Sequence, residues 1–114
     1  MSEPSDRAHS VRSERRSGLT TVVLSGELGP GVQADLDHVL GQLRQSAVTD
    51  VRVDMQGVTF CGSAGLSFLA QLYFCVDTSG HVLTVYNPPR VVMNALTVAG
   101  MQRLFPVVYD SSPP

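Results

Sequence analysis

Strand-like and helix-like segments alternate along this chain. Val51, Val53 and Met55 alternate with the charged residues Arg52 and Asp54, as in a strand, and the apolar run that follows has helical spacing. A strand, a helix and a second strand in succession favour parallel pairing with a right-handed crossover. The sequence therefore predicts an α/β fold, with a mixed, mostly parallel sheet packed against helices.

The expected elements follow one another without an internal repeat. The first two are strands, His9 to Ser13 and Leu19 to Leu24, which form an antiparallel leading hairpin that turns at Ser17-Gly18. The later ones are a helix from Val32, a strand that runs through Val58 and Phe60, a helix ended by Gly80, a strand His81 to Tyr86, a helix capped by Asn87 and ended by Gly100, and a short final strand.

Two helices have a predicted buried face. In the first helix this face is Leu36, Val39, Leu40 and Leu43. In the second it is Leu66, Leu69, Ala70, Tyr73 and Phe74.

Length and composition indicate one domain. The chain has 114 residues, 43% of them hydrophobic, which is enough for a single core and too few for two domains. We expect a flexible N-terminal tail over residues 1–8, a domain over 9–110 and a C-terminal tail over 111–114. The net charge of −2 gives no electrostatic reason to expect nucleic acid, so the expected partner is a protein.

No segment has the character of a membrane span or a signal peptide. The longest apolar run, Leu66 to Val76, is interrupted by polar residues and is shorter than the roughly 20 residues that a span requires. Cys61 and Cys75 form no zinc or redox motif, so we interpret them as reduced thiols of a cytoplasmic protein, with no metal site.

Ser63 stands where the predicted strand gives way to the second helix, between Gly62 and Gly65. The first N–H groups of a helix lack intrahelical partners, and the helix dipole adds positive charge there. This position therefore favours a side-chain oxygen or an anion such as phosphate. Ser63 is a candidate helix cap, nucleophile or phosphorylation site.

The sequence disfavours catalysis. A serine-hydrolase elbow needs Gly-x-Ser-x-Gly after a strand, but position 61 is cysteine, and no histidine is placed as a general base. The glycine-rich turn that begins at Gly26 lacks the endings of a phosphate loop and of a dinucleotide site. We therefore expect a protein that is not an enzyme and has no cofactor.

Loops that follow the carboxyl ends of parallel strands gather at one edge of a sheet. The loops over residues 26–31, 61–65 and 86–89 are of this kind, so we expect one surface around Ser63. Solvation or capping remains the alternative role for Glu27 and Asn87. The candidate partner contacts are Glu27, Gly29, Cys61, Gly62, Ser63, Ala64, Gly65, Leu66 and Asn87.

The segment Phe60-Cys61-Gly62-Ser63-Ala64-Gly65-Leu66 resembles the signature of the STAS family, the domain of anti-sigma factor antagonists and of the cytoplasmic parts of sulphate transporters. That signature is a strand, an Asp-Ser-Ser/Thr-Gly-Leu turn and an amphipathic helix. A second family element, Gly-Glu-Leu-Asp, is matched by Gly26-Glu27-Leu28-Gly29. The resemblance runs from about Ser10 to Asp110. The chain departs from it at Gly29, Gly62 and Ala64, which replace two acids and a hydroxyl.

The resemblance implies a bacterial regulator of transcription that works by partner switching. When unphosphorylated, it would bind an anti-sigma factor of the GHKL serine kinase type and release a sigma factor. The kinase would phosphorylate Ser63, and a phosphatase of the PP2C type would restore it. The alternative is a STAS interaction module that is never phosphorylated and serves as a scaffold or sensor component, because both expected acids are missing.

Overall fold

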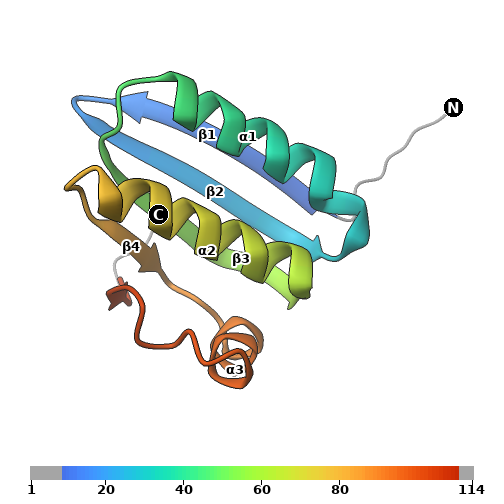
Figure 1. Cartoon of the computed structure of the whole chain (residues 1–114). Coiled ribbons are helices and arrows are strands. Elements are labelled where there is room, and N and C mark those ends of the chain that lie inside the picture. Colours follow the sequence, from blue (N-terminus) through green and yellow to red (C-terminus); the bar gives the residue numbers. More distant parts are fainter. Residues whose placement is uncertain (1–8, 111–114) are drawn as a thin grey trace, which may run out of the picture.

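A five-stranded sheet, in the order β1-β2-β3-β4-β5, organises the computed structural model of the protein (Figure 1). The structure describes residues 9–110, so both predicted tails lie outside the described residues. The strands are β1 (His9–Arg16), β2 (Leu19–Leu28), β3 (Asp50–Cys61), β4 (Leu83–Tyr86) and β5 (Val107–Val108). The helices are η1 (Pro30–Val32), a single 3-10 turn, and α1 (Gln33–Gln45), α2 (Ser63–Thr78) and α3 (Arg90–Val98).

The predicted sheet is confirmed. β1 pairs with β2 antiparallel, and all the other neighbours pair parallel. The hairpin turn has positive φ at both central residues, 54° at Ser17 and 78° at Gly18, and such a turn matches the twist of the strands that it joins. The strands are longer than the sequence predicts, since β1 extends to Arg16 and β2 to Leu28.

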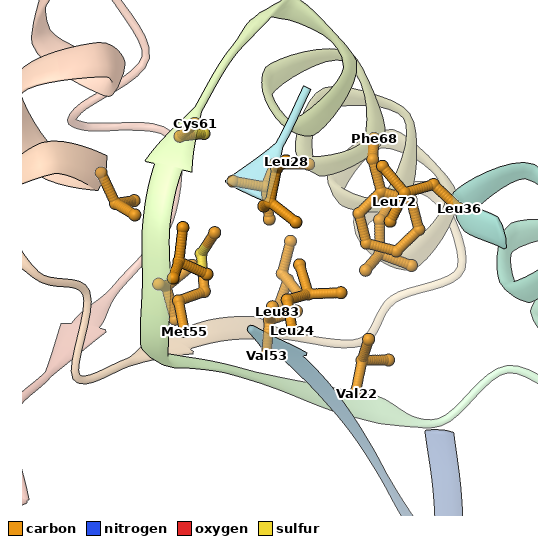
Figure 2. Close-up of a cluster of buried hydrophobic side chains, with 14 of the residues drawn as sticks. Val22, Leu24, Leu28, Leu36, Val53, Met55, Cys61, Phe68, Leu72 and Leu83 are labelled. Atoms are coloured by element: carbon orange, nitrogen blue, oxygen red, sulfur yellow. The ribbon is translucent and has the colours of Figure 1, made fainter. Parts of the chain in front are cut away.

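The hydrophobic core lies between the sheet and the two helices α1 and α2, which cover the same face (Figure 1). Val22 and Leu24 of β2 and Val53 of β3 point toward Leu36 of α1 and Leu72 of α2 (Figure 2). All five are fully buried. The face predicted for α1 is confirmed, with Leu43 packed at its margin.

Two bulges interrupt the second half of β3. The pairing with β2 shifts by one residue after Val23 and again after Gly26, so β3 has two extra residues by the time that Leu28 pairs with Cys61. Figure 2 shows β3 turning sharply near Met55. As a result Cys61 faces the core, whereas Phe60 is 49% exposed.

The face predicted for α2 is partly wrong. Leu69 is buried as predicted, and Leu66 and Tyr73 pack against the core. Phe74, however, is 68% exposed, and the other buried positions are Ala64, Gly65, Phe68, Leu72 and Val76. In this orientation Gly65 lies against the ends of β2 and β3, where a larger side chain would crowd its neighbours. A Cβ atom at Gly65 would stand 3.1 Å from both the Sγ atom of Cys61 and the Cδ1 atom of Leu28.

Asn87 does not cap the third helix. Pro89 directly precedes α3, and no side chain caps this helix. Asn87 has a φ of 54°, and its Oδ1 atom accepts a hydrogen bond of 2.7 Å from the backbone N–H of Asp110. Its role in the described structure is to hold the segment after β5 against the loop after β4.

Candidate functional site

Ser63 is the first residue of α2 and follows the end of β3 after a single residue, Gly62. The N–H of Gly62 donates a hydrogen bond of 3.0 Å to the carbonyl oxygen of Leu28 at the end of β2. The loops after β2 and β3 therefore meet beside Ser63, as predicted. This contact places the start of α2 directly on the sheet edge.

The Ser63 side chain is exposed and is not a helix cap. Gly62 occupies the cap position of α2, and no side chain makes a capping hydrogen bond there. Ser63 forms no side-chain hydrogen bond with any residue in the range 9–110. Its hydroxyl is therefore free to react or to contact another molecule.

The start of α2 also favours negative charge. The helix bond from the N–H of Leu66 to the carbonyl of Gly62, at 3.1 Å, is the first of this helix. The N–H groups of the preceding residues are the ones that a helix leaves without intrahelical acceptors, and they carry the positive end of its dipole. A phosphate on Ser63 would lie next to these donors.

Phe60 fills the space beside the two glycines that replace the acids of the STAS pattern. Its Cε2 atom lies 3.8 Å from the position of a Cβ at Gly29 and 3.0 Å from that of a Cβ at Gly62. The carbonyl oxygen of Leu28 also lies close to the Cβ position at Gly62, at 3.3 Å. A carboxylate at position 62 would therefore require the Phe60 ring to move. In this protein the exposed ring of Phe60 lies beside the two positions at which the family pattern has acids.

Glu27 remains an exposed acid at this edge. It pairs in register with Phe60, so the two residues are neighbours on adjacent strands. The surface around Ser63 thus combines one carboxylate with an exposed aromatic ring.

The other predicted contacts differ in accessibility. Cys61, Ala64 and Gly65 are buried, so they support the surface from below. Burial raises the pKa of the Cys61 thiol, which makes it a poor nucleophile. Gly29, Gly62, Leu66 and Asn87 are half-buried, and Glu27 and Ser63 are exposed.

Asn87 lies away from Ser63, contrary to the prediction of one surface from all three loops. β4 ends at Tyr86, which pairs with Asp54, while β3 continues from there to Cys61. The short β4 therefore ends level with the middle of β3. α3 packs against β3 beyond this point.

A groove of about 370 Å³ separates the start of α2 from α3. The α3 side of this groove was not among the predicted contacts. Val98 could have indicated this side from the sequence, because it is an apolar residue outside the buried stripe formed by Val92 and Leu96. Its side chain is 89% exposed. The lining residues are Cys61, Gly62, Ser63, Leu66, Asn94, Ala95, Val98 and Ala99.

Two of the three histidines in the described chain have carboxylate partners, and the third, His38, is exposed on α1. His9 lies 2.9 Å from the carboxylate of Asp35, and His81 lies 3.2 Å from that of Asp50. No group of three or more metal-ligating side chains occurs among residues 9–110. Within the same range, no helix has both the length and the apolar composition needed to cross a membrane.

Comparison with known proteins identifies a matching domain family and several solved structures with the same fold. A family model described as "Mlab, STAS domain" matches residues 11–108. No curated protein matches the chain. The fold is similar to that of the anti-sigma factor antagonist SpoIIAA in its unphosphorylated form, with a TM-score of 0.76 and 15% identity over 90% of each chain.

Two further structures share the fold. An anti-sigma factor antagonist from Mycobacterium paratuberculosis has a TM-score of 0.76 and 22% identity, over 87% of this chain and 84% of that one. The phosphorylated form of the Bacillus cell fate determinant SpoIIAA has a TM-score of 0.73 and 14% identity, over 90% of this chain and 93% of that one.

Proposed function

Because this chain belongs to the STAS domain family, we propose that it is an anti-sigma factor antagonist, which binds an anti-sigma factor and so frees a sigma factor. The antagonists that share its fold support this role. The proposed contact surface is the edge around Ser63, with Glu27, Phe60 and the groove between α2 and α3. It acts in the cytoplasm as a binding protein, not as a catalyst, and needs no cofactor.

Phosphorylation of Ser63 is the proposed off-switch. The partner is an anti-sigma factor of the GHKL serine kinase type, which transfers the γ-phosphoryl group of ATP to the Ser63 oxygen. A phosphatase of the PP2C type hydrolyses the phosphoserine and restores binding. A phosphate adds up to about two negative charges, and the start of α2 tolerates them while the docked partner does not.

The observation that carries this proposal is the free, exposed hydroxyl of Ser63 at the start of α2. If the hydroxyl capped the helix, phosphorylation would compete with a stabilising contact of about 1 kcal/mol. Since it caps nothing, its modification leaves the hydrogen bonds of the described structure intact.

A second candidate is a STAS interaction module that never switches. The arrangement of Phe60 over Gly29 and Gly62 favours it, because the resulting surface lacks the acids of the family pattern and presents an apolar ring. In this case the partner binds constitutively, and the domain serves as a scaffold or sensor component.

Incubation with the cognate anti-sigma kinase and ATP, followed by intact mass and peptide mapping, distinguishes the two. We expect one phosphate, on Ser63, and none on Ser63→Ala. Ser67→Ala is the matched control, because Ser67 is also exposed but lies one turn further along α2. Phosphate on Ser67 or Thr59 would contradict a switch at Ser63, and no phosphate with a competent kinase would favour the constitutive module.

A further inference from the structure

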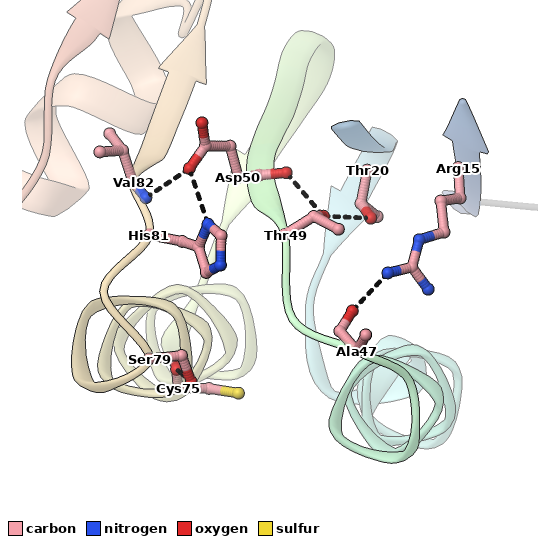
Figure 3. Close-up of polar contacts among 9 residues, drawn as sticks. All are labelled: Arg15, Thr20, Ala47, Thr49, Asp50, Cys75, Ser79, His81 and Val82. Atoms are coloured by element: carbon pink, nitrogen blue, oxygen red, sulfur yellow. Dashed lines mark hydrogen bonds and ion pairs between the residues drawn. The ribbon is translucent and has the colours of Figure 1, made fainter. Parts of the chain in front are cut away.

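A second pocket lies at the end of the sheet opposite Ser63. Its volume is about 270 Å³, and it lies between the last turns of α1 and α2 and the first residues of β2 and β3. Figure 3 shows this end of the molecule, including four of the lining residues, Arg15, Thr20, Ala47 and Cys75. The pocket shares no lining residue with the groove beside Ser63.

The inner wall of this pocket is apolar. Val51 of β3 and Leu72 and Val76 of α2 are buried there, and Leu43 of α1 packs against them. Cys75 adds a half-buried thiol. These side chains can surround an alkyl chain without leaving a polar group unsatisfied.

The polar groups of the inner wall are already satisfied within the chain. Thr49 donates a hydrogen bond of 2.9 Å to the carbonyl oxygen of Asp50, so the 2.8 Å contact between Thr20 and Thr49 uses the hydroxyl proton of Thr20 (Figure 3). These two threonines therefore require no polar partner from a ligand.

Two charged residues line the pocket, Glu14 and Arg15, and their side chains lie on opposite faces of the sheet. Arg15 pairs in register with Thr20, so both side chains lie on the helix-covered face of the sheet. The neighbouring Glu14 pairs with Thr21 on the other face, and its carboxylate bonds to Arg16 at 2.7 Å. The charge at the mouth of the pocket is therefore the positive charge of Arg15.

Arg15 is held in place at this mouth. It donates a hydrogen bond to the carbonyl oxygen of Ala47 in the loop after α1 (Figure 3). A guanidinium group has five N–H donors, and among the described residues this is the hydrogen bond that Arg15 makes. Its remaining donors can bind a carboxylate in a bidentate manner.

We propose that this pocket binds a medium-chain monocarboxylate, with the carboxylate on Arg15 and the alkyl chain between Leu43, Leu72 and Val76. A cavity of about 150 Å³ holds benzene. By the same proportion, a pocket of about 270 Å³ holds roughly ten non-hydrogen atoms, which is the size of octanoate. This proposal is independent of the function proposed for Ser63.

Calorimetric titration of the full chain with sodium octanoate tests the proposal. We expect saturable binding with one site, an affinity that rises about fourfold for each methylene from butanoate to octanoate, and no binding of octylamine, which has the same tail and the opposite charge. Octanoate should also protect Cys75 from alkylation by iodoacetamide, because Cys75 lines the pocket. Cys61 is buried and is the internal control.

Two adjacent arginines provide matched variants. Arg15→Gln should weaken octanoate binding about tenfold, whereas Arg16→Gln, on the opposite face of β1, should leave it unchanged. Circular dichroism checks that both variants fold. If Arg15→Gln does not fold, the comparison of octanoate with octylamine on the unaltered protein decides. Equal binding of the two compounds, no binding of octanoate, equal affinity for both variants, or no protection of Cys75 would overturn the proposal.

Discussion

The hydroxyl of Ser63 forms no hydrogen bond to the described residues, although serine at a helix start commonly caps the helix. The cap position belongs to Gly62, and Ser63 is the next residue. Because Ser63 lies one residue after the cap position, its hydroxyl does not cap the helix and remains available to another molecule. Its loss should affect binding and phosphorylation, not folding.

Ser63→Ala should change the free energy of unfolding by less than about 0.5 kcal/mol, the usual range for an exposed side chain without contacts. Leu69→Ala is the matched change on the buried face of the same helix. It should cost about 2–5 kcal/mol, because it leaves a cavity in the core. Urea denaturation measures both, and equal losses would mean that Ser63 has a structural contact.

Gly65→Ala should destabilise the protein by about 1–3 kcal/mol, because the new methyl group would press on Cys61 and Leu28. Gly41 is the control, since a Cβ there meets nothing within 4 Å. Gly41→Ala in α1 should stabilise by up to about 1 kcal/mol through helix propensity. Thermal unfolding compares the two, and stabilisation by both variants would contradict the close packing at Gly65.

At the scale of elements, the alternation of patterns predicted the helices, the hairpin and the parallel order, because each depends on local periodicity. The bulges in β3 were missed, although the apolar spacing lengthens from two residues to three between Met55 and Val58, and the intervening Gly57 is the kind of residue that marks a bulge. They turn Cys61 inward and Phe60 outward. The exposed ring over Gly29 and Gly62 was missed for this reason.

The register of β4 against β3 was equally hidden. β4 begins two residues later than predicted, at Leu83, and ends at Tyr86 as predicted, but Tyr86 pairs with Asp54, well before the end of β3 at Cys61. α3 then reaches the groove beside Ser63 in place of the Asn87 loop. Tertiary packing, which a single sequence does not display, decided this part of the site.

A polar clamp joins the loop after α2 to β3. The carboxylate of Asp50 accepts hydrogen bonds from the backbone N–H of Val82 at 3.0 Å and from His81 at 3.2 Å (Figure 3). The Val82 N–H, and then His81, lower the pKa of Asp50 below its ordinary value. The ionised carboxylate is therefore the form that folding favours.

This shift has a definite pH dependence. The stabilisation by Asp50 is present above its unfolded-state pKa, about 3.9, and is lost as the pH falls through the lower folded-state pKa. Asp50→Asn should be less stable than the unaltered protein at pH 7, and the difference should shrink below about pH 4. Urea denaturation across this range measures it, and a constant difference would show that ionisation of Asp50 is not involved.

At the scale of the whole molecule, the two ends of the sheet differ in character. The edge around Ser63 has an exposed aromatic ring and an apolar groove, and the opposite end has a pocket with Arg15 at its mouth. Exposed apolar surface next to a free hydroxyl is suited to a protein partner whose binding a phosphate can reverse.

The groove between α2 and α3 should contribute to anti-sigma factor binding. Val98→Asp should weaken it at least about tenfold, because a charge in an apolar contact is desolvated without a partner. Phe74→Asp is the matched control, since Phe74 is also an exposed apolar residue on a helix but does not line the groove. Pull-down and calorimetry should show normal binding for it. The same loss in both variants would remove the groove from the interface.

On this model of the switch, the state of Ser63 controls partner binding without altering the fold. Calorimetry at fixed salt with the anti-sigma factor and two variants, Ser63→Asp and Ser63→Ala, tests it most directly. Aspartate suits a helix start, so both variants should fold with near-normal stability. We predict that Ser63→Ala retains its affinity and that Ser63→Asp loses at least about tenfold, because its charge joins Glu27 in the contact surface. Equal affinity of the two variants would contradict the account.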